Sequence, residues 1–256
     1  MSSSYPPLIV LVPGAFGTPA GFEKFVPHLD GLETYPGGYP SCNPPDPFSA
    51  NCKADVASLR GVLLSLLDQQ RDLVILAHSY GGIVAGGAAK DLDQDTRKAQ
   101  GQNNAVIGLI YVAGNVTLEG ESLFEAVGGA YPPFIKSDKP SKGLAIIEPA
   151  MDILYNDYDP SLQPELDKFM NPHALQAFET KATAPAWKDK GFEQRRLYVR
   201  TLDDHCNPFS LQTSWIEKSG VEWDVIDLKT GHMPFVSQPE ALAAHVIAFV
   251  QRLTKL

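Results

Sequence analysis

Short, uninterrupted apolar runs alternate with amphipathic stretches along most of this chain. The run at residues 8–12, Leu-Ile-Val-Leu-Val, is rich in β-branched side chains and stops at Pro13-Gly14. Such a run is typical of a strand buried on both faces of a parallel sheet. In the intervals, apolar residues recur at helical spacing. The pattern predicts strands at residues 8–12, 73–77, 105–112, 196–201 and 222–228, and helices at 54–67, 80–91 and 239–253.

Strands that alternate with helices indicate βαβ units and a mostly parallel sheet. We therefore expect one α/β domain spanning residues 1–256, with its core in residues 1–113 and 191–256. The alternation breaks at about residues 114–190, a segment rich in Pro, Asp and aromatic residues. Helical pieces within 162–178, and no convincing strand, predict a helical lid inserted over the carboxyl edge of the sheet. The proline-rich stretch 35–47 is expected to be a loop.

The net charge of -9 over 256 residues, with no cluster of Lys and Arg, argues against nucleic acid as a partner. No run approaches the roughly 20 apolar residues of a membrane span, and the apolar run at 8–12, with no basic residue before it, is too short for the core of a signal peptide. We expect a cytoplasmic protein, a monomer or homodimer, that acts on a small molecule. Cys42 and Cys52 could form a disulfide, and Cys206 would then have no partner. The cysteine spacings indicate no metal site, and we expect no cofactor.

The candidate nucleophile is Ser79. The strand at 73–77 leads directly into Ala77-His78-Ser79-Tyr80-Gly81 and then into a helix, which is the context of a nucleophile elbow, small-x-Ser-x-Gly. The residues two before and two after the serine face each other across this turn, so both must be small. A glycine-rich turn used only for packing would give the same short string. The flanking strand and helix favour the catalytic interpretation.

A candidate base and acid follow the last two predicted strands. His232 lies after the strand at 222–228, where a general base can reach a hydroxyl at the carboxyl edge of the sheet. Asp203 and Asp204 follow the strand at 196–201, and either could orient the imidazole. The order Ser, Asp, His matches the α/β-hydrolase arrangement. His78, next to the serine, is expected to be structural.

A candidate oxyanion hole requires two backbone N–H groups near the nucleophile. One would come from Tyr80, directly after the serine. The other would come from the loop after the first strand, from Ala15, where Gly14 lets the backbone approach closely.

Together these segments resemble the α/β-hydrolase family, in the compact branch of methylesterases, hydroxynitrile lyases and microbial or fungal esterase-like proteins. The resemblance covers most of the chain outside residues 114–190. Members often carry Tyr-Val-x-Thr-x-x-Asp-x-x-x-Pro, and residues 198–208 fit this pattern, which implies that the acid is Asp204. Hydroxynitrile lyases carry Lys after the catalytic His and lack Gly in the oxyanion loop. Here Met233 and Gly14 occupy those positions, which favours ester hydrolysis.

These observations predict a serine hydrolase that cleaves a small, neutral, hydrophobic ester or lactone through an acyl-enzyme. Two alternatives stay open: a lyase, cyclase or dehydratase of secondary metabolism with the same triad, and a small-molecule receptor that retains a slow triad. The aromatic residues of the insertion are candidates for an apolar wall. The predicted substrate pocket comprises Gly14, Phe16, Phe124, Tyr131, Trp187 and Met233, with Phe134 and Tyr155 as further wall candidates.

Overall fold

A computed structural model describes residues 6–255 of the chain. Its centre is a six-stranded sheet in the order β2-β1-β3-β4-β8-β9, and every adjacent pair of strands is parallel. The predicted mostly parallel architecture is confirmed. The strands are β1 (Leu8–Val12), β2 (Thr34–Pro36), β3 (Leu73–His78), β4 (Val106–Val112), β8 (Arg196–Thr201) and β9 (Asp224–Leu228).

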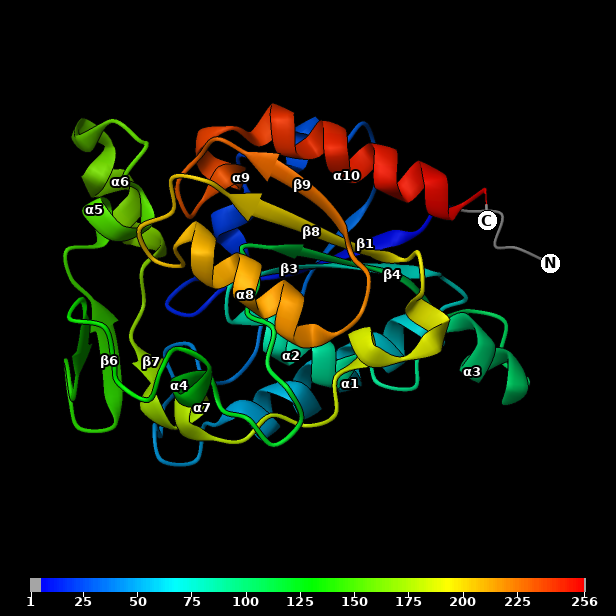
Figure 1. The fold of residues 1–256 in the computed structure, drawn as a ribbon, viewed down its shortest axis with the longest axis horizontal. Coiled ribbons are helices and arrows are strands. Elements are labelled where there is room, and N and C mark those ends of the chain that lie inside the picture. Colours follow the sequence, from blue (N-terminus) through cyan, green and yellow to red (C-terminus); the bar gives the residue numbers. More distant parts are fainter. Residues whose placement is uncertain (1–5, 256) are drawn as a thin grey trace.

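Helices cover both faces of this sheet, with α1 and α2 below it and α10 above it in Figure 1. The central strands β1, β3 and β4 are buried along their whole length, as their unbroken apolar runs predict. The helices of the core are α1 (Cys52–Leu67), α2 (Gly81–Ala88), α3 (Gln94–Ala99), α8 (Phe209–Ser219), α9 (Pro234–Ser237) and α10 (Pro239–Leu253), with 3-10 turns at η1 (Pro19–Phe22) and η2 (Val26–His28).

The small residues of α2 allow it to lie directly against the sheet and against α1. A Cβ at Gly82 would lie 2.8 Å from the backbone oxygen of Asn115, and one at Gly87 would lie 2.8 Å from a methyl of Val56. Real Cβ atoms do not tolerate such distances, so larger side chains would push the helix outward. Because α2 begins two residues after Ser79, its close packing also fixes the position of that serine.

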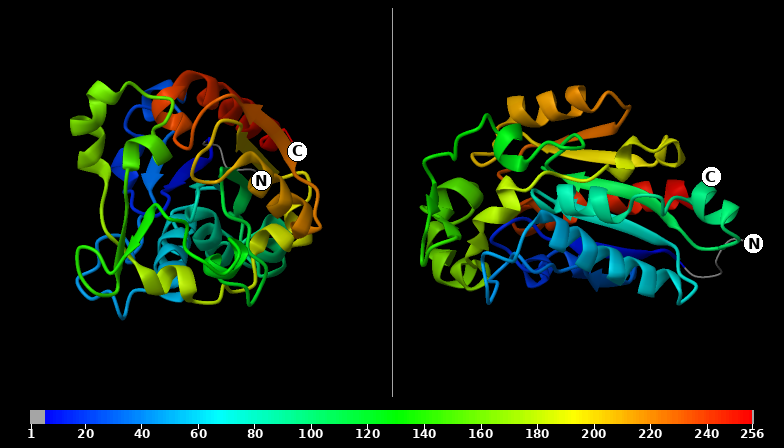
Figure 2. Two further views of the ribbon diagram at one scale, coloured as in Figure 1. Left: turned by 60° about the vertical axis from the view of Figure 1, so that its left-hand side comes forward. Right: turned by 90° about the horizontal axis from the view of Figure 1, so that it is seen from below.

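Most of the segment between β4 and β8 lies at the carboxyl ends of the strands, and its last part returns toward α3 at the other end of the sheet (Figures 1 and 2). It is helical only in part, because β5, β6 and β7 form a small antiparallel sheet that the sequence pattern did not predict. The helical pieces expected within 162–178 are present at residues 163–166, 167–169 and 175–179, with a short strand between them. The elements are α4 (Leu123–Ala126), β5 (Ile135–Ser137), β6 (Leu144–Ile147), α5 (Ala150–Leu154), η3 (Pro160–Leu162), α6 (Gln163–Leu166), η4 (Asp167–Phe169), β7 (His173–Ala174), α7 (Leu175–Glu179), η5 (Ala186–Lys188) and η6 (Lys190–Phe192).

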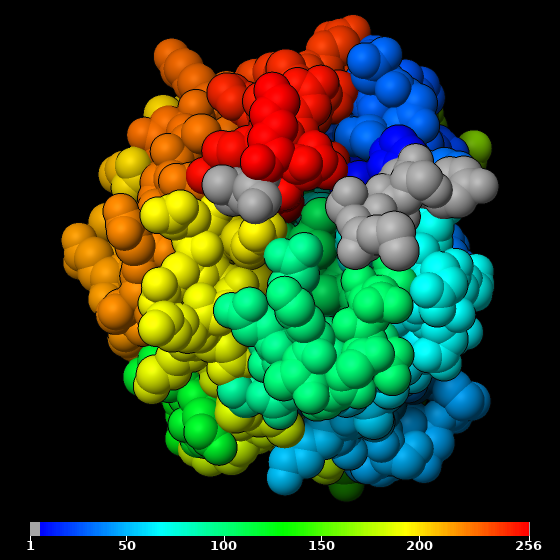
Figure 3. Space-filling model, turned by 90° about the vertical axis from the view of Figure 1, so that its right-hand side faces the viewer, coloured from blue at the N-terminus to red at the C-terminus, as the bar shows by residue number. Residues whose placement is uncertain are grey.

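The amino ends of the strands lie at the opposite end of the molecule. Figure 3 shows this face, where the end of α10 (red) lies above the segment around α3 (green). Within residues 6–255, no helix is both long enough and apolar enough to cross a membrane. Cys42, Cys52 and Cys206 are free thiols, so the possible Cys42–Cys52 pair is not formed.

Candidate active site

Ser79 occupies the turn between β3 and α2 in a conformation that L-residues rarely adopt. Its φ is +50°, in the left-handed region. Its N–H donates to the Val112 oxygen at 3.1 Å, and its own carbonyl accepts from the N–H groups of Gly82 and Asn115, both at 2.9 Å. These hydrogen bonds hold the strained backbone in place on both sides. The turn therefore presents Ser79 at the wall of a cavity.

The glycines around this turn have no room for a side chain. A Cβ at Gly81 would lie 2.8 Å from the Val12 oxygen and closer still to the Pro13 oxygen. A Cβ at Gly14 would lie 2.9 Å from the Cβ of Ser79. The loop after β1 thus runs directly beside Ser79, as a loop that supplies an oxyanion donor must.

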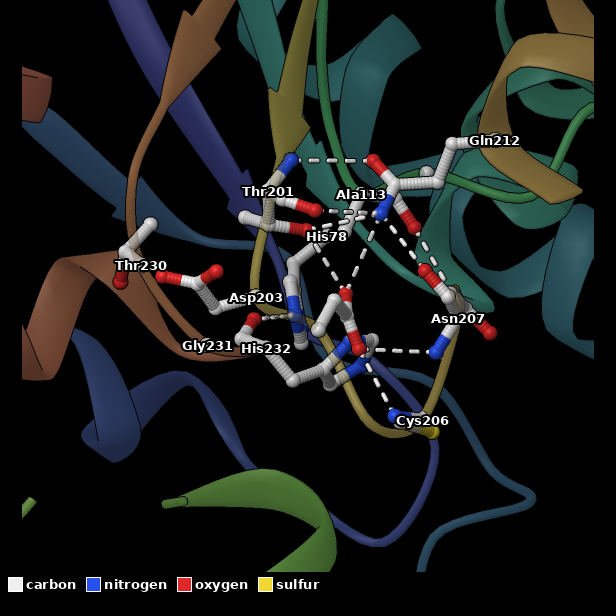
Figure 4. A network of polar contacts seen from close by, with 12 residues as sticks. His78, Ala113, Thr201, Asp203, Cys206, Asn207, Gln212, Thr230, Gly231 and His232 are labelled. Atoms are coloured by element: carbon white, nitrogen blue, oxygen red, sulfur yellow. Dashed lines mark hydrogen bonds and ion pairs between the residues drawn. The ribbon is translucent and has the colours of Figure 1, made fainter. Parts of the chain in front are cut away.

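His232 and Asp204 form a buried pair, in which the Nδ1 atom of His232 lies 2.8 Å from Oδ2 of Asp204. Figure 4 shows His232 in the surrounding polar network, beside His78, Cys206 and Asn207. Asp204 Oδ2 also accepts from the hydroxyl of Thr201 at 2.7 Å, and Oδ1 accepts from the N–H groups of Cys206 and Asn207, both at 2.8 Å. With its carboxylate fixed by these donors, Asp204 orients the imidazole and leaves Nε2 as the nitrogen available to a substrate or nucleophile.

The neighbouring Asp203 has a different environment. Its side chain is exposed, whereas Asp204 is 5% exposed. The backbone of Asp203 is paired instead: its N–H donates to the Thr230 oxygen at 3.1 Å, and its oxygen accepts from Nδ2 of Asn156 at 2.9 Å. Of the two candidate acids, the structure brings Asp204 to His232.

The electrostatics of the pair favour a charged imidazole. Burial by itself lowers the pKa of His232, but the adjacent Asp204 carboxylate outweighs burial, with a smaller contribution from Cys206, and the pKa is raised well above its ordinary value. An imidazolium formed during a reaction would be stabilised at this position.

His78 supports the same site from behind. Its Nε2 donates to the backbone oxygen of His232 at 2.9 Å, and the two rings lie 4.6 Å apart. Burial, followed by the charge of His232, lowers the pKa of His78 well below its ordinary value, so this ring stays neutral. His78 therefore holds the backbone of His232 and takes no part in proton transfer.

The N–H groups of Ala15 and Tyr80 are free to bind an oxyanion. Neither donates to a protein acceptor among the hydrogen bonds of residues 6–255. The Tyr39 hydroxyl contacts the oxygens of Pro13 and Gly14 at 2.9 and 2.8 Å. Because the Gly14 oxygen and the Ala15 N–H belong to one peptide group, Tyr39 fixes the direction of the Ala15 donor.

The Tyr80 donor is anchored through its own side chain. The Tyr80 hydroxyl donates to Oδ2 of Asp55 at 2.7 Å, and Oδ1 of Asp55 accepts from the N–H of Ser41 at 2.9 Å. On the other side of the loop, the N–H of Phe16 donates to Nδ1 of the buried His173 at 3.3 Å. A buried polar cluster therefore supports both candidate donors from beneath.

One cavity of about 250 Å³ contains Ser79, His232, Ala15 and Tyr80 in its wall. Of the predicted pocket residues, Phe16, Phe124, Tyr131 and Phe134 line it. The rest of its lining is Asn115, Leu123, Val127, Pro132, Ile135, Ile147, Leu154, Phe178, His205, Cys206, Asn207, Pro208 and Leu211.

The pocket assignments of Gly14, Trp187, Met233 and Tyr155 are corrected, because none of these residues lines the cavity. Trp187 is fully buried with its ring 6.3 Å from that of Trp223, and it packs against Gly86 of α2. Gly14 and Met233 are each adjacent in sequence to a site residue but contribute backbone or core packing. The sequence alone does not indicate whether an aromatic side chain packs in the core or lines the cavity.

Sequence reasoning missed several lining residues, among them Asn115, Phe178 and Leu211. Asn115 follows the end of β4, and a polar residue directly after a buried parallel strand was the available signal. Phe178 and Leu211 carry no such signal, because α7 and α8 reach the cavity only through the packing of distant segments. No group of three or more His, Cys, Asp or Glu side chains within residues 6–255 is arranged to hold a metal ion.

Comparison with known proteins agrees with this geometry. The chain matches the alpha/beta hydrolase family over residues 9–245, and it belongs to that family. It is 26% identical over 241 residues to alpha/beta hydrolase nvfD of Aspergillus novofumigatus, covering 91% of this chain and 92% of the relative. It is 23% identical to a pyrethroid hydrolase of Sphingobium wenxiniae, covering 94% and 86% of the two chains.

Solved structures show the same fold. The methylesterase MES16 of Arabidopsis superposes with a TM-score of 0.70 at 19% identity, covering 96% of this chain and 99% of that one. A pyrethroid hydrolase from Sphingobium faniae superposes with a TM-score of 0.74 at 19% identity, covering 98% and 99%. The predicted resemblance to the α/β-hydrolase family is confirmed, and the protein is a hydrolase of this fold with ester-hydrolysing relatives.

Proposed function

We propose that this protein is a serine esterase that cleaves a small, neutral, hydrophobic carboxylic ester or lactone, with Ser79 as nucleophile, His232 as base and Asp204 as the orienting acid. The observation that carries the proposal is the buried 2.8 Å contact between His232 Nδ1 and Asp204 Oδ2, beside a strained serine in the same cavity wall. Ester-hydrolysing relatives support the same chemistry.

In the first half of the reaction, Ser79 Oγ forms a bond to the substrate carbonyl carbon while Nε2 of His232 takes the hydroxyl proton. The tetrahedral oxyanion accepts hydrogen bonds from the N–H groups of Ala15 and Tyr80. Its collapse breaks the bond to the leaving alcohol, which receives the proton from His232. In the second half, water attacks the acyl carbon while His232 takes its proton; collapse breaks the bond to Ser79 Oγ, which receives that proton from His232, and the carboxylic acid is released.

The cavity lining supports a neutral, apolar substrate. Among residues 6–255, no Asp, Glu, Lys or Arg side chain lines the cavity, and most of the lining is aliphatic or aromatic. A charged substrate would lose its hydration in this cavity without gaining an ionic partner, which is costly. Besides the catalytic groups, the polar lining residues are His205, Cys206 and the amides Asn115 and Asn207.

The test is turnover of p-nitrophenyl butyrate against a matched ester with a terminal carboxylate, followed by mass spectrometry of the protein quenched during turnover. We expect preference for the neutral ester and an acyl adduct on the peptide containing Ser79. Ser79→Ala should be folded and inactive. Ester turnover retained in Ser79→Ala would contradict the proposal, as would product formation with no adduct, which a lyase mechanism predicts.

A further inference from the structure

One short segment of the insertion contacts both loops that carry the candidate acid and base. This segment, residues 152–157, extends from α5 toward η3. On the acid side, Asn156 Nδ2 donates to the Asp203 oxygen at 2.9 Å, and His205 Nδ1 donates to the Asp152 oxygen at 2.7 Å. These contacts lie on either side of Asp204 in sequence.

On the base side, a single carboxylate oxygen receives three donors. Asp157 Oδ2 accepts from the Thr230 hydroxyl at 2.6 Å, the Gly231 N–H at 2.8 Å and the Ser237 hydroxyl at 2.7 Å. The donors precede and follow His232 in the chain. Hydrogen bonds to an ionised acceptor are roughly twice as strong as neutral ones, so this one carboxylate closes the loop 230–237 on itself.

The segment also packs against Gly231 without space between them. A Cβ at Gly231 would lie 2.5 Å from Oδ1 of Asn156 and 2.7 Å from Oδ1 of Asp157. The residue that precedes His232 is therefore in direct contact with the insertion. Any shift of residues 156–157 changes the room available to the backbone on the amino side of His232.

Two contacts from other parts of the chain also hold His232. Asp204 holds the ring at Nδ1, and His78 holds the backbone oxygen. The amino side is left to Gly231, whose N–H is bound by Asp157. Leu154, three residues before Asp157, lines the cavity, so the same segment forms part of the substrate wall.

We propose that Asp157 is a positioning residue, through which the insertion holds the loop 230–237 and sets the position of the His232 imidazole relative to Ser79. This inference rests on the proposed esterase function. The insertion then does more than cover the cavity. Residues 152–157 must be correctly positioned for the His232 imidazole to reach Ser79.

The test compares kcat and KM for p-nitrophenyl butyrate in Asp157→Ala, Asp157→Asn and a matched control, Asp159→Ala. Asp159 is an exposed carboxylate two residues away that accepts from the Ser161 N–H and touches neither loop. Because small misplacement of a catalytic group reduces turnover strongly, we expect kcat to fall about tenfold in Asp157→Ala with KM nearly unchanged. Asp157→Asn should be intermediate, and the control should match the wild type.

A second variant keeps the test valid if Asp157→Ala does not fold. Ser237→Ala removes one of the three donors and should lower kcat below that of the wild type, again without raising KM. Equal kcat in the wild type, Asp157→Asn and Ser237→Ala would overturn the positioning role, as would a loss confined to KM. Failure of the wild type to hydrolyse any ester would instead remove the proposed function.

Discussion

At the scale of single residues, two adjacent aspartates have separate environments. Asp204 is buried, accepts hydrogen bonds from Thr201, Cys206 and Asn207, and contacts His232. Asp203 is exposed, and only its backbone is hydrogen-bonded. Physical reasoning from the sequence did not decide which of the two aspartates contacts the histidine. Both follow the same strand, and only the turn geometry determines which side chain faces inward.

Replacing each aspartate by asparagine gives a matched pair of variants. In Asp204→Asn, kcat should fall on the order of 10⁴-fold, because the amide no longer stabilises the imidazolium or its correct tautomer. Asp203→Asn should stay near the wild-type rate. Steady-state kinetics with p-nitrophenyl butyrate measures both, and a similar loss in the two variants would contradict the assignment of Asp204.

Tyr39 offers a test of the oxyanion hole that leaves its two donors in place. Tyr39→Phe removes the hydroxyl that holds the Gly14 oxygen, so the Ala15 N–H should be less well aimed at the oxyanion. We expect kcat to fall about tenfold with little change in KM, since the oxyanion forms only in the transition state. The control is Tyr111→Phe, which removes another buried hydroxyl bound to a backbone oxygen, that of Gly82. Equal kcat in the two variants would remove this role for Tyr39.

At the scale of elements, the predictable part of the fold is the part with a strong local pattern. The buried strands β1, β3, β4 and β8 could be placed because their apolar runs are uninterrupted. β2 was missed, since it is a three-residue edge strand that contains Pro36 and has little buried surface. β5, β6 and β7 have only two to four residues each, and the pairing of β6 with β7 joins segments as far apart in the sequence as Leu144 and Ala174.

The helical pieces expected within 162–178 form, but a short strand that was not expected separates them. Pro172 disfavours helical geometry at Asn171, and the chain there forms β7 before α7 begins. The proline indicates a break in the helical structure, but it does not indicate that the chain will pair as a strand. The same limit applies to the cavity: its lining from α7 and α8 depends on how these helices pack.

The tight contact between the elbow and the loop after β1 leads to a prediction about stability. Gly81→Ala should lower the free energy of unfolding by about 3 kcal/mol, because the new methyl would overlap the backbone of Val12 and Pro13. Gly61 lies on the exposed face of α1, where a methyl would have no atom within 4 Å. Because Ala favours the helix more than Gly does, Gly61→Ala should raise the free energy of unfolding by roughly 0.5–1 kcal/mol. Urea unfolding measures both, and equal stability of the two variants would contradict the packing described here.

At the scale of the whole molecule, the nucleophile, acid and base candidates follow the carboxyl ends of β3, β8 and β9, and Figure 2 shows much of the insertion at the same end of the sheet. His173 of the insertion accepts the N–H of Phe16 in the loop after β1 and is 0% exposed. Burial lowers the pKa of His173 to about 3. The neutral imidazole is therefore part of the folded state.

The resulting pH dependence has a definite sign. Between about pH 6.5 and 3 the unfolded chain binds a proton at His173 that the folded protein does not, so this residue makes stability fall as pH falls. In His173→Gln, the slope of unfolding free energy against pH in this range should be shallower by about 1.4 kcal/mol per pH unit. Urea titrations at pH 6 and pH 4.5 measure the slope; an unchanged slope would contradict a neutral buried His173.

The most direct test of the proposed triad is reaction of the folded protein with a fluorophosphonate probe, followed by peptide mapping. The probe requires an activated serine and two oxyanion donors but no knowledge of the natural substrate. We expect one modified residue, Ser79, with labelling abolished in Ser79→Ala and strongly slowed in His232→Ala. Labelling at another residue, or none in folded wild-type protein, would contradict it.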